Sequence, residues 1–262
     1  MPLSVQATKV YPDDETVVHW RGLTINDAAE FDLFLRGPVR ARVTDSTFVG
    51  DFETDLQGLA TTEMATDTLK ALLNADVPMV DWEIGEAVAE CLLEEEDGAT
   101  WPWNENRDRK TPRASLPGAD LVGFVGEGED VAILFGEVKT SSHRSTPPGV
   151  MNGRGGMIHQ IDTLATSVEV HFALLKWLFA RCSDDELRVK FKSAAKRYLD
   201  SGGKDVVLVG VLLRDTTPHV KDLQSRGEAF GPPVVQKPRL RLDAWYTPRP
   251  IDDWVTITTS EA

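Results

Sequence analysis

The sequence predicts an α/β (α+β) protein in which one mixed central sheet is flanked by helices, and three observations support this class. A near-continuous apolar run, Val206–Leu213, is typical of a strand that is buried on both faces of a sheet. Two further apolar runs, Ala119–Val125 and Val131–Val138, are separated by a polar, glycine-containing loop and indicate a β-hairpin. Apolar residues at helical spacing over Val80–Glu96 and Met157–Arg181 indicate helices that pack on this sheet.

The elements that precede these are shorter. Three runs of β-forming residues, Thr16–Trp20, Phe31–Leu35 and Val39–Val43, alternate with polar turns and predict short strands. A helix is predicted over Glu63–Asn74, where apolar residues recur at helical spacing. Pro78 then interrupts the chain. We therefore expect an N-terminal acidic region over residues 1–78 and the main domain over residues 79–262.

The remaining elements follow from periodicity and turn residues. Gly98 ends the Val80–Glu96 helix, because glycine readily adopts the left-handed conformation of a helix C-cap. Residues 140–156 are rich in Ser, Gly and Pro and predict a long flexible loop. The further predicted elements are a basic helix over Asp184–Leu199 and short strands near Leu240–Tyr246 and Trp254–Thr258.

The charge of the chain is unevenly distributed. Its 262 residues contain 42 acidic and 28 basic side chains, for a formal net charge of −14. This balance argues against a freestanding, non-specific nucleic-acid-binding protein, because phosphate contacts need clustered Lys and Arg. Residues 1–97 hold 21 acidic and 6 basic side chains (net −15), whereas residues 98–262 hold 21 and 22 (net +1). The excess acid therefore belongs to the first third.

Cysteine usage and hydropathy indicate the compartment. Cys91 and Cys182 lie in apolar helical patterns, and we expect two buried thiols in a reducing compartment rather than a disulfide or a metal site. The sequence has no run of 18 apolar residues, and its N-terminus lacks the charged and apolar segments of a signal peptide. These features predict a cytoplasmic protein that does not associate with a membrane.

Three charged residues, Asp120, Glu137 and Lys139, lie at the ends of the two hairpin strands. Residues two apart in a strand point to the same face, so Glu137 and Lys139 share a face, and the facing strand brings Asp120 beside them. Charges at the ends of buried strands are costly unless they are paired or hold a metal. Two carboxylates suit Mg²⁺, with Mn²⁺ as a substitute, and Lys139 is then placed to orient or activate a bound water.

The same residues resemble a known family. A Gly-x-Asp sequence ending at Asp120, followed by Glu137-x-Lys139 at a strand end, resembles the PD-(D/E)XK nuclease superfamily. The helix that contains Glu86 is similar to the first helix of that family's core, and Gln160 matches a glutamine that often follows the motif. The resemblance extends over about residues 80–214. The Pro-Asp pairing of the family is relaxed here to Pro-Gly-Ala-Asp.

The resemblance implies a restriction-endonuclease-like core and a metal-dependent phosphodiesterase that acts on DNA. It assigns Asp120, Glu137 and Glu86 to the metal site, and it adds Lys139 and Gln160 to the catalytic set. Two alternatives stay open. The first alternative to this nuclease is a catalytically silent, nuclease-like scaffold or interaction subunit of a defence complex, and the second is a standalone restriction endonuclease with sequence specificity.

Within the superfamily, the chain is most similar to the nuclease subunit of Hachiman anti-phage defence systems (HamA). The similar features are a Gly-Glu helix, a Leu-Pro-Gly-Ala-Asp strand, a Phe-Gly-Glu-Val-Lys strand and an additional N-terminal region. This likeness implies a helicase partner (HamB-like) that restrains the nuclease until phage or damaged DNA is sensed. The acidic first third is then expected to dock a partner or to shield the DNA groove.

Basic residues flank the predicted metal site in the sequence, as expected for a rim that binds DNA phosphates, with ordinary solvated loops as the alternative. A second basic group on the Asp184–Leu199 helix predicts a DNA-binding or partner-binding face. For Glu83, Glu90 and Glu94 we expect a solvated helix face, although helical position alone does not separate Glu83 from Glu86. The DNA-binding candidates are Arg107, Arg109, Lys110, Arg113, Arg144 and Arg154.

Overall fold

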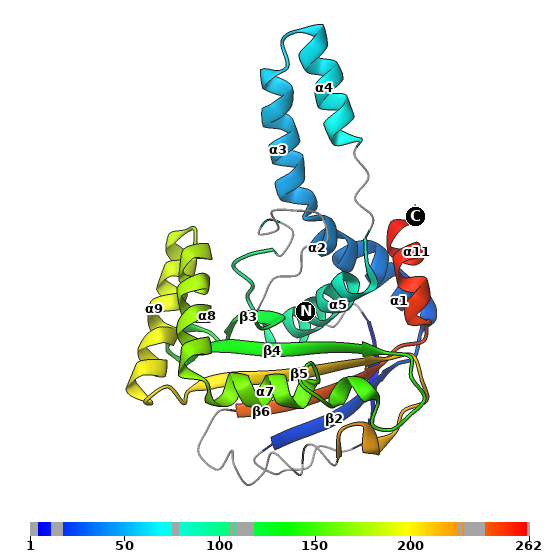
Figure 1. Cartoon of the computed structure of the whole chain (residues 1–262), viewed down its shortest axis with the longest axis vertical. Coiled ribbons are helices and arrows are strands. Elements are labelled where there is room, and N and C mark those ends of the chain that lie inside the picture. Colours follow the sequence, from blue (N-terminus) through cyan, green and yellow to red (C-terminus); the bar gives the residue numbers. More distant parts are fainter. Residues whose placement is uncertain are drawn as a thin grey trace.

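The computed structural model describes residues 5–11, 18–74, 79–104, 107, 118–224, 227 and 239–260. Its centre is a six-stranded sheet with the strand order β1-β2-β6-β5-β4-β3. Helices lie on both faces of this sheet (Figure 1). The strands are β1 (Ala7–Tyr11), β2 (Val18–Ile25), β3 (Leu121–Val125), β4 (Ala132–Ser141), β5 (Val206–Arg214) and β6 (Arg239–Tyr246).

The sheet is mixed in strand direction. Strands β2, β6, β5 and β4 run parallel to one another, whereas the edge strands β1 and β3 pair antiparallel with β2 and β4. Strand β5 lies between two parallel neighbours, which explains why nearly all of its residues are apolar. The α/β class with a mixed sheet, the β3–β4 hairpin and the buried β5 strand are therefore confirmed.

The helices differ in length and in the face of the sheet that they cover. A π-helical segment (Leu35–Val39) joins the first two of them. The helices of the described residues are α1 (Ala28–Phe34), α2 (Arg40–Thr44), α3 (Ser46–Leu59), α4 (Glu63–Leu73), α5 (Asp81–Asp97), α7 (Met157–Thr166), α8 (Val168–Arg181), α9 (Asp185–Asp200) and α11 (Trp254–Thr259).

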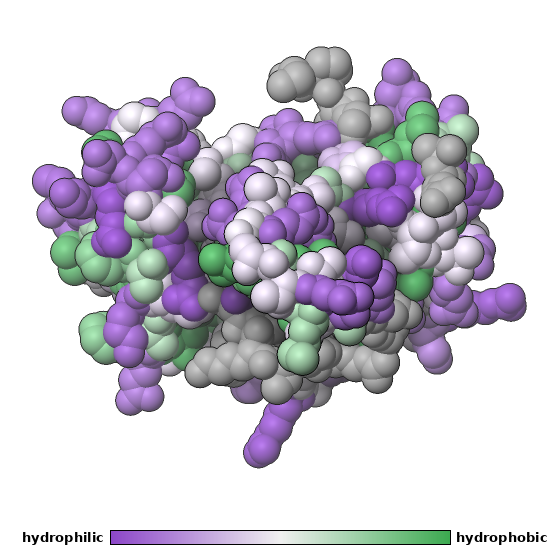
Figure 2. Space-filling view, turned by 90° about the horizontal axis from the view of Figure 1, so that it is seen from above, coloured by the Kyte–Doolittle hydropathy of each residue, from purple (hydrophilic) through white to green (hydrophobic). Residues whose placement is uncertain are grey.

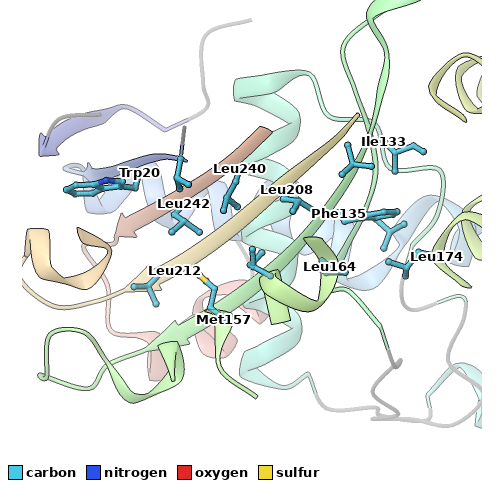
Figure 3. Close-up of a cluster of buried hydrophobic side chains, with 14 of the residues drawn as sticks. Trp20, Ile133, Phe135, Met157, Leu164, Leu174, Leu208, Leu212, Leu240 and Leu242 are labelled. Carbon is cyan, nitrogen blue, oxygen red and sulfur yellow. The ribbon is translucent and has the colours of Figure 1, made fainter. Parts of the chain in front are cut away.

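Helices α7, α8 and α9 cover one face of the sheet. Figure 3 shows the apolar layer beneath them, in which Phe135 of β4 and Leu208 of β5 lie near Met157 and Leu164 of α7 and Leu174 of α8. These residues belong to one continuous buried cluster. Side chains of odd-numbered β4 residues therefore point toward α7.

Helix α5 covers the opposite face. Its residues Val88 and Leu92 are buried in a second cluster together with Leu134 of β4. A Cβ atom on Gly85 would lie 2.5 Å from Cγ2 of Thr140, so the glycine allows α5 to approach β4 closely. Helices α5 and α7 thus lie on opposite sides of the same strand.

Several elements agree with their sequence patterns. Helices α4, α5 and α9 and strand β6 are confirmed. Gly98 ends α5 with a left-handed φ of 63°, as expected for a C-cap. Cys91 and Cys182 are both buried and carry free thiols, as predicted. The described part of the Thr16–Trp20 run belongs to β2, and residues 16 and 17 lie outside the described residues.

The prediction of strands at Phe31–Leu35 and Val39–Val43 is wrong, because both segments are helical. The carboxylate of Asp27 accepts hydrogen bonds from the backbone N–H groups of Ala29 and Glu30 and so caps α1. This cap and the packing of the α1 aromatic residues on α11 outweigh the β-propensity of the short apolar runs.

Two further elements differ from the prediction. Residues Trp254–Thr258 belong to helix α11 rather than to a strand, and the Trp254 ring packs edge-on against Phe31 at 5.7 Å. The single helix predicted over Met157–Arg181 is divided at Ser167, whose hydroxyl caps α8. Strand β4 also extends through Ser141 into the predicted loop.

Helices α3 and α4 form a helical hairpin that projects from the body of the molecule (Figure 1). Figure 2 views the molecule from above, along the direction of this projection, and shows hydrophobic side chains scattered among hydrophilic ones. Strands β1 and β2 belong to the same sheet as β3–β6, so the N-terminal residues also build the central sheet. Within the described residues, no helix has the length and apolar character needed to cross a bilayer.

Candidate active site

The β3–β4 hairpin brings Asp120 next to Glu137. Leu121 pairs with Gly136 in the antiparallel register, so the residue before Leu121 lies opposite the residue after Gly136. The backbone N–H of Val138 donates to Oδ2 of Asp120 at 2.8 Å, and the two carboxyl groups are close enough that each affects the pKa of the other. The structure therefore places these carboxyl groups side by side, as the hairpin pattern predicts.

Lys139 adds a positive charge to this pair from the same face of β4. Its Nζ forms an ion pair with Oε1 of Glu137. Glu137 is only 3% exposed, whereas 21% of the Lys139 side chain is exposed. Lys139 thus lies on the more accessible side of the cluster, and we call Asp120, Glu137 and Lys139 the carboxylate cluster.

A glycine on β5 shapes the space beside Glu137. Gly210 lies opposite Glu137 in the parallel register of β4 and β5. A Cβ atom on Gly210 would lie 2.7 Å from Cδ2 of Leu242 and 2.9 Å from Sδ of Met157. The glycine therefore allows the first residue of α7 to reach the sheet next to the cluster. Sequence reasoning missed this position, although a lone glycine in the Val206–Leu213 run is a signal of close approach.

Burial makes both carboxyl groups of the cluster difficult to ionise. Burial, followed by the charge of Asp120, raises the pKa of Glu137 to about 7, while Lys139 opposes the shift. Burial also raises the pKa of Asp120, and the Val138 N–H and Lys139 oppose it. One ammonium group therefore compensates two carboxylates incompletely near neutral pH.

The chemistry of these donors fits a hard divalent cation. Mg²⁺ is commonly bound by one or two carboxylates, with water and substrate phosphate oxygens completing its coordination. A cation between Asp120 and Glu137 would relieve the repulsion that raises the pKa of Glu137. In the part of the chain that the structure describes, no group of three or more His, Cys, Asp and Glu side chains is arranged to hold a metal ion. The protein ligands brought together are thus the two carboxylates.

The other two predicted catalytic residues lie on different helices. Gln160 is on α7, which covers the same face of the sheet as Glu137, and its Nε2 donates to the carbonyl oxygen of Arg154 at 3.3 Å. Glu86 is on α5, which packs on the opposite face. The structure does not bring Glu86 into one metal-binding group with Asp120 and Glu137.

The expected solvated face of α5 is wrong for two of its three glutamates. Glu83 is buried, and its Oε2 accepts the backbone N–H of Val80 at the start of the helix. Glu90 is also buried, with Oε2 lying 3.5 Å from Nε of Arg42. Glu94 is half exposed and pairs with the same arginine. Helix α2, which carries Arg42, packs against α5 and places this arginine beside Glu90 and Glu94.

The basic candidates are dispersed. Arg144 lines a cavity of about 650 Å³ at the carboxyl ends of β4 and β5, beyond Lys139, and Arg154 is exposed in the segment before α7. Arg107 instead pairs with Asp45 at the start of α3. The predicted residues Arg109, Lys110 and Arg113 lie outside the described residues.

The basic group on α9 is largely engaged with acidic neighbours. Lys190 pairs with Glu186, Lys196 with Asp200, and Arg197 with Asp130 and Asp205. These contacts reduce the positive charge that this helix offers to a polyanion.

No known family model matches the sequence, and no curated protein was found to be similar to it.

Proposed function

We propose that the chain is a metal-dependent nuclease that hydrolyses phosphodiester bonds of DNA. The observation that carries this proposal is the carboxylate cluster, in which the buried carboxyl group of Glu137 lies beside the partly buried one of Asp120 and a lysine pairs with Glu137. Such incompletely compensated, buried charges are characteristic of sites that bind cations or perform acid–base chemistry. The motif resemblance to PD-(D/E)XK nucleases supports the same reaction.

In this proposal, Asp120 and Glu137 hold Mg²⁺ or Mn²⁺. When bound, such a cation would supply Lewis acidity toward a phosphoryl oxygen and would lower the pKa of a bound water. Lys139 is the more exposed member of the ion pair with Glu137, and in this proposal it orients a water or a phosphate oxygen. The Val138 N–H fixes the carboxylate of Asp120, and Gly210 leaves the space beside Glu137 open to α7.

The charge distribution is compatible with a DNA substrate. The overall charge is −14, but the residues from 98 onward are close to neutral. Arg144 and Arg154 are exposed in the segment that connects β4 to α7, next to the cluster in the sequence. In this proposal, both supply the positive charge that phosphate contacts require.

The test is cleavage of supercoiled plasmid by the purified chain with Mg²⁺ or Mn²⁺. We expect Glu137→Gln and Lys139→Met each to lower the rate by at least about a hundredfold, because each removes a group from the reacting centre. Lys196→Met is the matched control, since Lys196 is largely exposed and pairs only with Asp200 among the described residues. Thermal unfolding of every variant verifies that it is folded.

The cleavage products separate the alternatives. General degradation supports a non-specific nuclease, whereas a discrete set of fragments indicates a sequence-specific restriction endonuclease. Equal cleavage by wild type and the Glu137→Gln/Lys139→Met double variant contradicts the assigned site. A folded protein that cleaves neither alone nor with a helicase partner is the scaffold of the alternative hypothesis.

We further propose a role in anti-phage defence together with a helicase, which rests on the resemblance to Hachiman nuclease subunits. A helicase encoded beside this chain supports the proposal. The functional test is plating of phage on cells that carry both genes, with wild-type chain or Glu137→Gln. Loss of protection in the variant is expected, and unchanged protection contradicts a defensive nuclease.

A further inference from the structure

The projecting α3–α4 hairpin exposes apolar side chains that no element among the described residues covers. Neither α3, with 14 residues, nor α4, with 11, contains a buried residue. Leu59, Met64 and Leu72 are 75%, 80% and 62% exposed. Isolated helices of this length are marginally stable in water and usually depend on packing of an apolar face. Binding of a partner to these apolar side chains would therefore stabilise the α3–α4 hairpin.

A groove runs between the two helices. Its volume is about 380 Å³, and its walls are predominantly apolar. Among the lining residues, Leu56 and Leu59 lie one turn apart on α3, and Leu69 and Leu72 lie one turn apart on α4. Two antiparallel helices with facing apolar stripes form the groove into which a third amphipathic helix packs.

The hairpin carries a strong negative charge. Residues 46–73 contain five acidic side chains and one basic one. Within the described residues, no basic side chain forms an ion pair with any of these five acids. Like charges disfavour a second copy of the hairpin and an anionic membrane as the covering surface, and they favour a basic one. The acidic residues are Asp51, Glu53, Asp55, Glu63 and Asp67.

We propose that the groove between α3 and α4 binds an amphipathic helix of another protein, whose apolar stripe is flanked by Lys and Arg. The apolar stripe fills the groove, and the basic flanks meet the unpaired acids of the hairpin. This inference does not depend on the nuclease assignment, because the hairpin contains none of the residues of the carboxylate cluster.

The test uses the full chain and labelled helical peptides. A peptide with leucines at helical spacing and lysines at the other surface positions is compared with one in which glutamates replace the lysines. We expect measurable binding of the lysine peptide only. Leu69→Gln and Leu72→Gln should each weaken that binding about tenfold or more, because each removes a leucine that the complex buries.

Leu199→Gln is the matched control and should leave binding unchanged, since Leu199 is 72% exposed and belongs to α9, which lies well apart from α3 and α4 (Figure 1). Asp55→Asn/Asp67→Asn should weaken binding and reduce its salt dependence. Equal binding by Leu72→Gln and Leu199→Gln variants overturns the proposal. A stable dimer that Leu72→Gln dissociates, or preferential binding of anionic vesicles, also overturns it. Plasmid cleavage is measured on the same variants and should be unaffected.

Discussion

Two clusters of buried charge lie on opposite faces of the same sheet and differ in how their charges are compensated. The carboxylate cluster faces α7, and it contains one lysine for two carboxyl groups. The second cluster lies on the α5 side, between β2, β6 and the end of α5. We call it the paired network, and it consists of Arg21, Arg241, Asp243, Glu96 and Asp97.

The paired network satisfies its charges with planar, two-pronged contacts. Nε and Nη2 of Arg21 donate to the two carboxylate oxygens of Asp243 at 2.8 and 3.2 Å. Arg241 forms the same kind of contact with Asp97 at 2.7 and 2.5 Å. Burial by itself lowers the pKa of Arg21, but the hydrogen bond and charge of Asp243 outweigh burial, and the pKa rises. The neighbouring carboxylates likewise raise the pKa of Arg241, so both arginines are held in their charged form.

The carboxylate cluster behaves in the opposite way. Burial and the neighbouring Asp120 raise the pKa of Glu137 to about 7, because Lys139 alone does not offset two carboxyl groups. The comparison teaches that burial of charge is not a uniform feature of this protein. In the paired network every carboxylate contacts an arginine, and these contacts fasten α5 to the sheet. In the carboxylate cluster the one lysine pairs with only one of the two carboxyl groups, which leaves a site that a cation would stabilise.

The largest expected effect is on the paired network. Asp243→Asn removes the negative charge that Arg21 and Arg241 share. The two partly buried arginines then lose this carboxylate partner. We expect the free energy of unfolding to fall by about 3–5 kcal/mol. Chemical denaturation at pH 7 measures this change. Glu94→Gln is the control, because Glu94 is half exposed and its loss should cost about 1 kcal/mol or less. Equal, small effects of both variants would remove the distinction between the clusters.

Neutralising a carboxylate in the carboxylate cluster should raise the free energy of unfolding rather than lower it. A carboxyl group whose folded-state pKa is raised contributes stability at low pH that is lost as pH rises through that value. Glu137→Gln mimics the neutral form, so it should stabilise the protein by about 3 kcal/mol at pH 8. The gain should shrink as pH falls from about 7 toward 4.5 and vanish below. Denaturation of wild type and variant at several pH values measures it, and destabilisation at pH 8 contradicts the unequal compensation.

Much of this fold follows from local pattern. The β3–β4 hairpin, β5, α5 and α9 have periodicities or turn residues that contain enough information to place them. The carboxylate cluster follows as well, because its members are joined by a hairpin whose register is set by a short loop. The α1 and α11 helices were not predictable in this way, since their short apolar segments are stabilised by mutual packing of Phe31 and Trp254.

The paired network also depends on long-range contacts. In β6, Arg241 and Asp243 alternate with Leu240 and Leu242, which is the pattern of a strand with one solvated face. The strand is instead central, and its polar face is covered by the end of α5 and by Arg21 of β2, which are more than a hundred residues away in the chain. A sequence pattern identifies the polar face but not the partners that cover it.

The smallest expected effect is that of a divalent cation on stability, which should depend on the carboxylate cluster and not on the paired network. A cation that binds the folded carboxylate cluster stabilises it, by about 1.4 kcal/mol when Mg²⁺ or Mn²⁺ is tenfold above its dissociation constant. For a chain of this size, that corresponds to a rise in melting temperature of about 3 °C. The rise should be lost in Glu137→Gln, because a neutral amide is a poorer ligand for a hard cation. It should persist in Asp243→Asn, whose charges are already paired away from the cluster. A rise of equal size in Glu137→Gln would show that the cation binds elsewhere. The incompletely compensated charges of Asp120 and Glu137 would then not be explained by a metal site.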